Sequence, residues 1–251
     1  MDAGRLSICG EESFGTGSDH IREKDGLWAV VGRSRWNLSS ASLTFYIAWL
    51  NIIAAENEKS PNKLIGINEL LEEFYSTYGR SFFSRYDYEE VSSEGANALV
   101  DHLNQALKSG SLNNSDHFSA STSTKFTVSG LYNFEYKDPI DHSVSKNQGQ
   151  VITFSDGSRV VFRLSGTGSQ GATVRMYVER YVAADAGKAE LTKPTPEGLK
   201  SLIEVALDIS KLKEFLGRDQ PTVITVSSHE YIGFNNDRRF LQVIPVSARI
   251  K

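Results

Sequence analysis

The sequence predicts an α/β segment followed by an α+β domain in which helices cover an antiparallel sheet. Apolar residues recur at helical spacing before Lys108, and short apolar strands follow from Phe126 onward. Asp156-Gly157, between two apolar stretches, is the dipeptide of a tight β-hairpin turn. A chain of 251 residues is long enough for one large domain or two small ones.

The first part of the chain, residues 1–80, begins with a predicted buried strand at Leu6–Cys9 that ends at Gly10. A helical pattern starts at Trp28–Val31 and resumes at Ala48–Ala55. The stretch between them, 32–47, has neither the apolar period nor the charge of a helix face. We therefore expect residues 32–47 to be an insertion.

A second helix is predicted at Glu69–Tyr78, with Asn68 as its N-cap and Gly79 just after its end. The segment that follows, 81–92, is too aromatic for a flexible linker. We expect it to be an ordered crossover between two domains.

Residues 93–226 are predicted to form the α+β domain. A helix at Ser93–Lys108 has an apolar stripe, and a last helix spans about Pro196–Leu216. Between them we expect a polar loop at 109–125 and an antiparallel sheet, with strands at Phe126–Val128, Asn133–Tyr136, Gln150–Phe154, Arg159–Leu164 and Ala172–Val178. Residues 227–251 show no clear periodicity, and we expect this tail to be disordered.

Composition excludes several classes of function. The formal charge of −4 and the pI near 5.8 argue against a nucleic-acid partner. Cys9 is the only cysteine, so an intrachain disulfide is impossible and a reducing compartment is favoured. No apolar run approaches the ~20 residues of a membrane span, and the first residues lack a signal-peptide core. We expect a cytoplasmic protein without a membrane partner.

Two polar segments far apart in the sequence are candidate ligand sites. Arg163–Arg175 combines two arginines with Ser, Gly and Thr, a composition that suits a phosphate. The alternative is an ordinary turn with solvated arginines. Gly10–Gly15 contains Glu11 and Glu12, whose carboxylates can accept hydrogen bonds from sugar hydroxyls. The alternative there is a structural turn with exposed acids.

Other polar residues carry weaker signals. Lys24 lies in a run of charged residues, which is usually a solvated face, and His20 is typical of a capping or surface histidine. No His, Cys and Asp residues have metal-ligand spacing, and no G-x-S-x-G motif occurs. Catalytic residues are therefore not predicted within this chain.

At the two candidate sites the chain resembles a known family. Ile8–Val30 resembles the sugar loop in the third domain of eukaryotic phosphoglucomutase, a member of the α-D-phosphohexomutase superfamily. Four later segments resemble the rest of its C-terminal part, in the same order: Tyr78–Arg80, Arg85–Glu90, Asn133–Tyr136 and Arg163–Tyr177. The resemblance implies a partial α/β/α third domain in residues 1–80 and a phosphate-binding fourth domain in residues 93–226.

The resemblance also implies roles for individual residues. Glu11, Ser13 and Lys24 would bind the substrate at its sugar, with Lys24 reaching its phosphate side. The phosphate that is not transferred would be held by Arg163, Ser165, Gly166, Thr167 and Arg175. The family interconverts glucose 1-phosphate and glucose 6-phosphate through glucose 1,6-bisphosphate and a phosphoserine, with Mg²⁺. The implied partner is thus a hexose phosphate.

The departures from the family are as specific as the resemblance. The chain has no Ser-His-Asn loop, which would carry the phosphoserine, and no Asp-Gly-Asp run, which would hold Mg²⁺. We therefore expect a C-terminal fragment that is inactive alone, with residues 32–47 and the tail as artefacts such as translated intron. The alternatives are a non-catalytic module that binds sugar phosphates and one half of a split gene whose missing N-terminal domains are encoded upstream.

Overall fold

The computed structural model describes the backbone of residues 8–10, 16–18, 40–59, 63–168, 171–218, 220–226 and 247–249, and the side chains of 50–59, 63–165, 171–218 and 220–226. The chain divides into two compact units, Met1–Thr77 and Tyr78–Lys251.

The first unit contains a short antiparallel pair and two helices. Strand β1 (Ile8–Gly10) pairs with β2 (Thr16–Ser18), so the strand predicted at Leu6–Cys9 is confirmed for its last two residues. The helical pattern predicted at Trp28–Val31 lies outside the described residues.

Helix α2 runs over Ser40–Lys59 and is longer than predicted. It begins inside residues 32–47, so the interpretation of this stretch as non-helical is wrong from Ser40 onward. That residues 32–47 are an insertion stays a prediction. The segment from Ser40 contains neither Gly nor Pro and continues directly into Ala48–Ala55, so nothing in it stops a helix. The end of α2 is held by Asn57, whose side chain bonds to both Ile65 N (2.7 Å) and Ile65 O (2.9 Å).

Helix α3 covers Ile67–Tyr78. Asn68 is inside this helix and not its cap, because the first helical bond runs from Leu70 N to Gly66 O (3.2 Å). The Glu69 carboxylate accepts from the Gly66 N–H (3.1 Å) and so satisfies a donor at the helix start. Gly79 has φ +78 and ends the helix as predicted.

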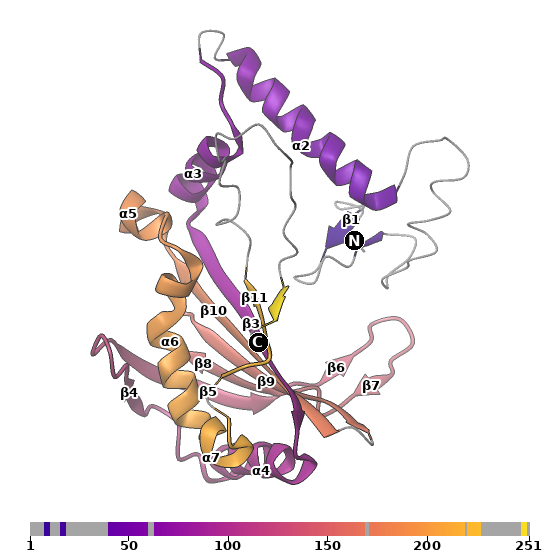
Figure 1. Cartoon of the computed structure of the whole chain (residues 1–251), viewed down its shortest axis with the longest axis vertical. Helices are drawn as coiled ribbons and strands as arrows, with labels where there is room; N and C mark the ends of the chain where they lie inside the picture. The colour runs from indigo at the N-terminus through magenta and orange to yellow at the C-terminus, as the bar shows by residue number, and fades with distance from the viewer. Residues whose placement is uncertain are drawn as a thin grey trace. The chain divides into compact units, whose positions relative to one another are not determined.

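The second unit is built on an antiparallel sheet, which confirms the predicted fold class (Figure 1). Among the described residues eight strands pair in the order β12-β11-β3-β10-β9-β8-β5-β4. Their bounds are β3 Arg80–Val91, β4 Asp116–Phe118, β5 Lys125–Asn133, β8 Gln150–Phe154, β9 Arg159–Gly168, β10 Gly171–Val182, β11 Val223–Val226 and β12 Ser247–Arg249.

Strand β3 corrects the prediction for residues 81–92. This segment is not a crossover between domains but a strand inside the sheet, hydrogen-bonded to β10 on one side and β11 on the other. Its side chains alternate: Phe82, Tyr86 and Tyr88 are buried toward the helices, whereas Arg85, Asp87 and Glu89 lie on the opposite face. The α+β unit therefore begins before residue 93.

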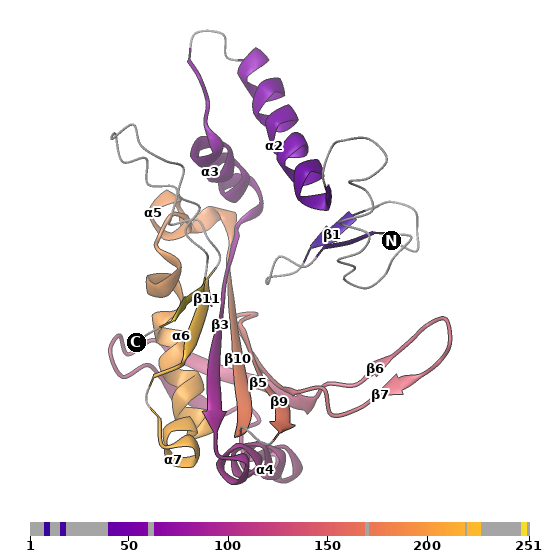
Figure 2. The same cartoon turned by 45° about the vertical axis from the view of Figure 1, so that its right-hand side comes forward.

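Helices cover one face of the sheet, as predicted (Figures 1 and 2). Helix α4 (Ser93–Ser109) is capped by the Ser92 side chain, which accepts from Gly95 N at 2.9 Å. The predicted last helix is in fact two, α6 (Thr195–Ser210) and α7 (Leu212–Leu216). Lys211 separates them because its backbone is left-handed, with φ +51.

The remaining elements join these layers. The hairpin predicted at Asp156-Gly157 is confirmed, with Gly157 at φ +84 between β8 and β9. Strand β4 lies within the predicted loop 109–125. Strand β12 lies within the tail 227–251, so the prediction of a disordered tail is wrong at Ser247–Arg249. Strands β6 (Tyr136–Lys137) and β7 (Val144–Ser145) form an arm that extends from the sheet (Figure 2).

Two short helical elements precede α6: a 3-10 turn at Ala184–Ala186 and helix α5 at Lys188–Leu191. In the part of the chain that the structure describes, no helix is both long enough and apolar enough to cross a membrane.

Candidate phosphate-binding site

The two arginines predicted to bind phosphate lie on neighbouring strands of the sheet. Arg163 of β9 and Arg175 of β10 are directly opposite each other in the antiparallel register. The alternation of β10 places Arg175 on the face that points away from the helices, since Val174 and Met176 are buried on the other face. Arg163 is exposed and about a third of the Arg175 side chain is accessible.

The β9–β10 hairpin has a bulge at the predicted site. Thr173 pairs with Ser165 and Ala172 pairs with Thr167, so Gly166 is left without a partner on β10. Ser165–Gly168 thus belong to strand β9 rather than to an open loop, with Ser165 half-buried. A bulge redirects the strand and takes one residue out of the ladder, and bulges are common beside active sites.

A second irregularity lies on the other side of β10. The register with β3 shifts between Ala172, which pairs with Val91, and Val174, which pairs with Tyr88. Thr173 alone therefore lies opposite two residues of β3, Glu89 and Glu90. In this part of β3, Glu90 has φ +55, a conformation uncommon for a residue other than glycine. Gly171 lies close by, because a Cβ there would be 3.0 Å from Val91 O. Both strands that flank β10 are therefore irregular next to the predicted phosphate site.

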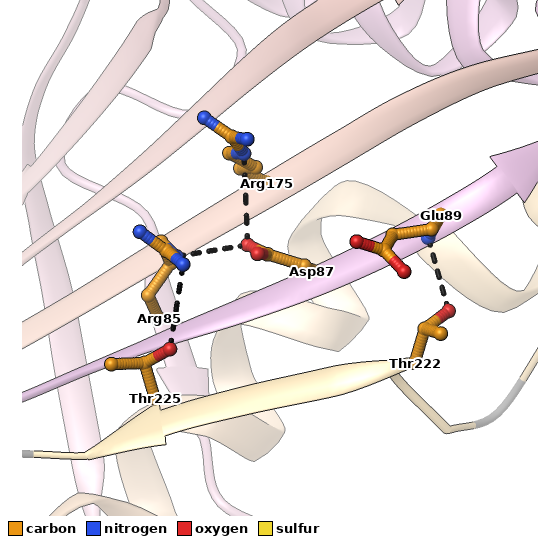
Figure 3. A network of polar contacts seen from close by, with 6 residues as sticks. All are labelled: Arg85, Asp87, Glu89, Arg175, Thr222 and Thr225. Atoms are coloured by element: carbon orange, nitrogen blue, oxygen red, sulfur yellow. Dashed lines mark hydrogen bonds and ion pairs between the residues drawn. The ribbon is translucent and has the colours of Figure 1, made fainter. Parts of the chain in front are cut away.

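A buried carboxylate completes the row of charged residues across the sheet (Figure 3). Asp87 of β3 is directly opposite Arg175 and is only 4% exposed. Its Oδ1 lies 3.0 Å from Arg85 Nε and 3.8 Å from Arg175 Nε. Arg163, Arg175 and Asp87 therefore occupy successive strands at one level of the sheet.

Hydroxyl groups of β11 and the turn before it bond to residues of β3 beside this row (Figure 3). Thr225 Oγ1 is 3.4 Å from Arg85 Nη2, and Thr222 Oγ1 accepts from Glu89 N at 3.1 Å.

On the helix side of β3, burial raises the pKa of Tyr88 to about 12, so that its phenol stays neutral. The face opposite Tyr88 thus carries Arg85, Asp87, Arg163 and Arg175.

The sequence predicts a phosphate role for Arg163, Ser165, Gly166, Thr167 and Arg175, which stays a prediction, but does not single out Asp87 and Arg85, which the sheet places beside Arg175. The crossover predicted for 81–92 gives its side chains no defined direction, whereas strand β3 does. The signal was nevertheless present: Arg85 and Asp87 are two residues apart, a spacing that places both on one face of a strand.

Three other predicted site residues, Glu11, Ser13 and Lys24, lie outside the described residues, so their roles stay predictions. Among the side chains that the structure describes, no group of three or more His, Cys, Asp or Glu residues could hold a metal ion. The described residues therefore do not fit the Mg²⁺ that the resemblance implies.

Comparisons with known proteins agree with this architecture. Residues 80–222, more than half of the chain, match the family described as phosphoglucomutase-1, C-terminal domain. The match begins at the first residue of β3 and ends in the turn before β11, and so it contains the row from Arg163 to Asp87.

Curated relatives extend the similarity to 90% of the chain. It is 48% identical to the chloroplastic phosphoglucomutase of Arabidopsis thaliana, covering 32% of that protein. It is 46% identical to phosphoglucomutase-1 of Dictyostelium discoideum, covering 36% of it. The chain thus spans about a third of the length of these relatives.

A solved structure is similar as well. It is the open form of the exocytosis-sensitive phosphoprotein pp63/parafusin, a phosphoglucomutase from Paramecium, with a TM-score of 0.64 and 41% identity. The similarity covers 90% of this chain and 34% of that one. The chain belongs to the phosphoglucomutase family, and residues 80–222 match the family's C-terminal domain.

Proposed function

We propose that the β9–β10 hairpin binds the phosphate of a hexose phosphate that is not being transferred, as part of the interconversion of glucose 1-phosphate and glucose 6-phosphate. The observation that carries the proposal is the register pairing of Arg163 with Arg175. Two guanidinium groups on the helix-free face of the sheet, beside the Gly166 bulge, form a site of concentrated positive charge.

The chemistry of a phosphate suits this arrangement. Each guanidinium can donate two parallel hydrogen bonds to phosphate oxygens, and each hydrogen bond to a charged group contributes roughly 1.5–3 kcal/mol. The half-buried Ser165 hydroxyl, on the same strand and face as Arg163, adds a donor. A few such bonds are enough for micromolar recognition.

A clamp on the remote phosphate fits the reaction, in which the bisphosphate must turn around between two transfers. A site that contacts only the phosphate accepts either end of the sugar, because both ends carry the same group. Its contribution would be to position the ligand, which is the main source of catalysis in phosphoryl transfer.

The transfer itself needs groups that this chain does not supply. The sequence has no Ser-His-Asn loop and no Asp-Gly-Asp run, and the described residues do not fit Mg²⁺. Mg²⁺ and glucose 1,6-bisphosphate, which the family uses, would act at residues supplied by the other two thirds of a full-length relative. We propose that this chain alone binds hexose phosphate without turning it over.

Calorimetric titration of the purified chain with glucose 6-phosphate tests the binding. We expect saturable binding that is lost in Arg163→Ala and retained in Arg159→Ala. Arg159 is a matched control because it lies on the same strand but pairs with Glu179. Absence of saturable binding by the unmutated chain contradicts the proposal.

A mutase assay tests the second half of the proposal. With Mg²⁺ and glucose 1,6-bisphosphate present, we expect no turnover above a mock preparation. Turnover by the purified chain would show that it supplies the transfer groups after all. Binding without turnover also fits the alternative of a non-catalytic sugar-phosphate module, whereas turnover contradicts both.

The cellular compartment remains part of the proposal. The relatives include a cytoplasmic phosphoglucomutase from Mesembryanthemum crystallinum as well as chloroplastic ones. We propose a cytoplasmic protein, which fits a chain with a single cysteine. Fluorescence microscopy of the tagged protein tests this, and accumulation in a plastid contradicts it.

A further inference from the structure

We propose that Asp87 is a positioning residue that holds the Arg175 guanidinium by its Nε side and directs the Nη groups toward the bound phosphate. This inference rests on the proposed function of Arg175. It concerns a residue that would not touch the ligand but would determine how a ligand-binding side chain is presented.

The contact geometry supports a holding role. Asp87 and Arg175 are directly opposite on β3 and β10, and Asp87 Oδ1 is 3.8 Å from Arg175 Nε. Figure 3 shows the two terminal nitrogens of Arg175 pointing away from Asp87. The ion pair therefore uses the inner part of the guanidinium and leaves the outer fork for a ligand.

Burial makes the carboxylate a fixed point. The Asp87 side chain is 5% exposed, and the same oxygen lies 3.0 Å from Arg85 Nε. A buried charge is tolerated only when partners compensate the loss of water, so Asp87 is held between the two arginines. Arg85 is in turn bonded to Thr225 (3.4 Å), which anchors it to β11.

The charge balance of the row explains why such a residue is needed. Arg163 and Arg175 face each other across β9 and β10, and like charges directly opposite on a sheet repel. Without a counter-charge, the Arg175 guanidinium would have no fixed position when no phosphate is bound. Asp87, on the other flank of Arg175, offsets the repulsion and fixes the Nε end of Arg175, which pre-organises this side chain.

Replacement by asparagine separates this role from simple electrostatics. Asp87→Asn keeps the size of the side chain and removes its charge. If Asp87 mainly repelled the nearby phosphate, the substitution would strengthen phosphate binding. If Asp87 positions Arg175, the substitution weakens it, and we expect the dissociation constant for glucose 6-phosphate to rise about tenfold, the scale of losing a residue that orients a ligand-binding group.

A double-mutant cycle gives the decisive test. Calorimetry with glucose 6-phosphate is done on the unmutated chain, Asp87→Asn, Arg175→Gln and the double variant. We expect Asp87→Asn to have no further effect on binding once Arg175 is glutamine. A residue that only supported the fold would weaken binding equally in both backgrounds.

Asp116→Asn is the matched control. Asp116 is also a strand aspartate paired with a basic residue, Lys125 at 3.2 Å, but it is exposed and lies on β4. We expect it to bind glucose 6-phosphate as the unmutated chain does. If Asp87→Asn does not fold, Asp87→Glu replaces it in the cycle, and we expect intermediate affinity because the charge is kept but displaced.

The outcomes separate this inference from the proposed function. Tighter or unchanged binding in the folded Asp87 variant, or equal losses in both backgrounds, overturns the positioning role while the phosphate site stands. Absence of binding by the unmutated chain overturns the phosphate site, and the positioning role with it.

Discussion

Arg163 and Arg175 form a like-charged pair directly across the β9–β10 hairpin, four residues along from the oppositely charged pair of Arg159 and Glu179. The two pairs share the same strands and the same face, since four residues are two full periods of a strand. They differ in that only the second pair is complementary. The first pair is repulsive, and Asp87 offsets the repulsion only from the Arg175 side.

Arg163→Gln is therefore expected to raise the free energy of unfolding in phosphate-free buffer, by about 0.2–1 kcal/mol, because it removes a cross-strand repulsion. Arg159→Gln is expected to lower it by a similar amount, because it removes an attraction. Urea unfolding of the two variants measures both. Addition of glucose 6-phosphate should reverse the advantage of Arg163→Gln, because ligand binding stabilises only a chain that can bind it.

A loss of stability in Arg163→Gln without ligand would contradict this prediction. It would show that the Arg163 side chain makes a stabilising contact that outweighs the repulsion by Arg175.

The buried guanidinium of Arg80 is expected to be the most sensitive polar position of the second unit. Its Nη1 donates to Leu191 O and Lys193 O, both at 2.8 Å, and its guanidinium lies 4.0 Å over the Phe82 ring. Arg80→Leu leaves two carbonyl oxygens without this donor, and we expect a loss of about 2–4 kcal/mol in the free energy of unfolding. Chemical denaturation measures the loss.

Arg180→Leu is the matched control for Arg80. Arg180 is only half-buried, and its guanidinium donates to Gly198 O at 3.1 Å. We expect it to cost less than about 1.5 kcal/mol, the net value of one such bond. Equal losses of unfolding free energy in the two variants would show that burial of the Arg80 guanidinium does not increase its contribution to stability.

Gly198 of α6 is expected to be required for the packing of α6 on β3. A Cβ at this position would lie 2.8 Å from the Phe82 ring, closer than real carbon atoms approach. Gly198→Ala should therefore lower the free energy of unfolding by about 1–3 kcal/mol from overpacking, despite the better helix propensity of alanine.

The smaller side chain in Phe82→Leu provides the control. If the clash is with the Phe82 ring, the double variant is more stable than the sum of the two single effects predicts, by about 0.5 kcal/mol or more. Additive losses would place the clash elsewhere.

The sequence predicted the elements whose signals are local. The Asp156-Gly157 turn and the stripe of Ala96, Leu99 and Leu103 on α4 are confirmed because each depends on neighbouring residues alone. The break at Lys211 was missed because a left-handed lysine does not change the apolar pattern on either side of it. Strand β3 was not predicted, because the aromatic content of 81–92 indicates an ordered segment but does not by itself distinguish a crossover from a strand.

The sequence indicates only part of the candidate site, because only part of it lies within one short segment of the chain. Arg163 and Arg175 are in one hairpin, and a short segment of sequence shows them together. Asp87 comes from a strand far earlier in the chain and reaches Arg175 only through the pairing of β3 with β10. No single-sequence pattern reports such a pairing, because it depends on how the strands are ordered in the sheet.

Glu204 of α6 is expected to make the stability of the second unit depend on pH. Its Oε2 accepts from Ser119 Oγ (2.6 Å) and from Ser121 N (3.0 Å), and these hydrogen bonds lower the pKa of Glu204 to about 2. Because this lies below the ordinary value of 4.5, ionised Glu204 stabilises the fold above pH 4.5. The stabilisation is lost as the pH falls from 4.5 toward 2.

Glu204→Gln tests this dependence, because glutamine keeps the shape but cannot be ionised. We expect the variant to be less stable than the unmutated chain at pH 7, and the difference in the free energy of unfolding to shrink to near zero as the pH approaches 2. Ser119→Ala should raise the pKa of the Glu204 carboxyl, measured by carbon-detected NMR, because the donor of the 2.6 Å hydrogen bond is removed. A difference between Glu204→Gln and the unmutated chain that stays constant from pH 7 to pH 2 would show that the Glu204 charge does not stabilise the fold.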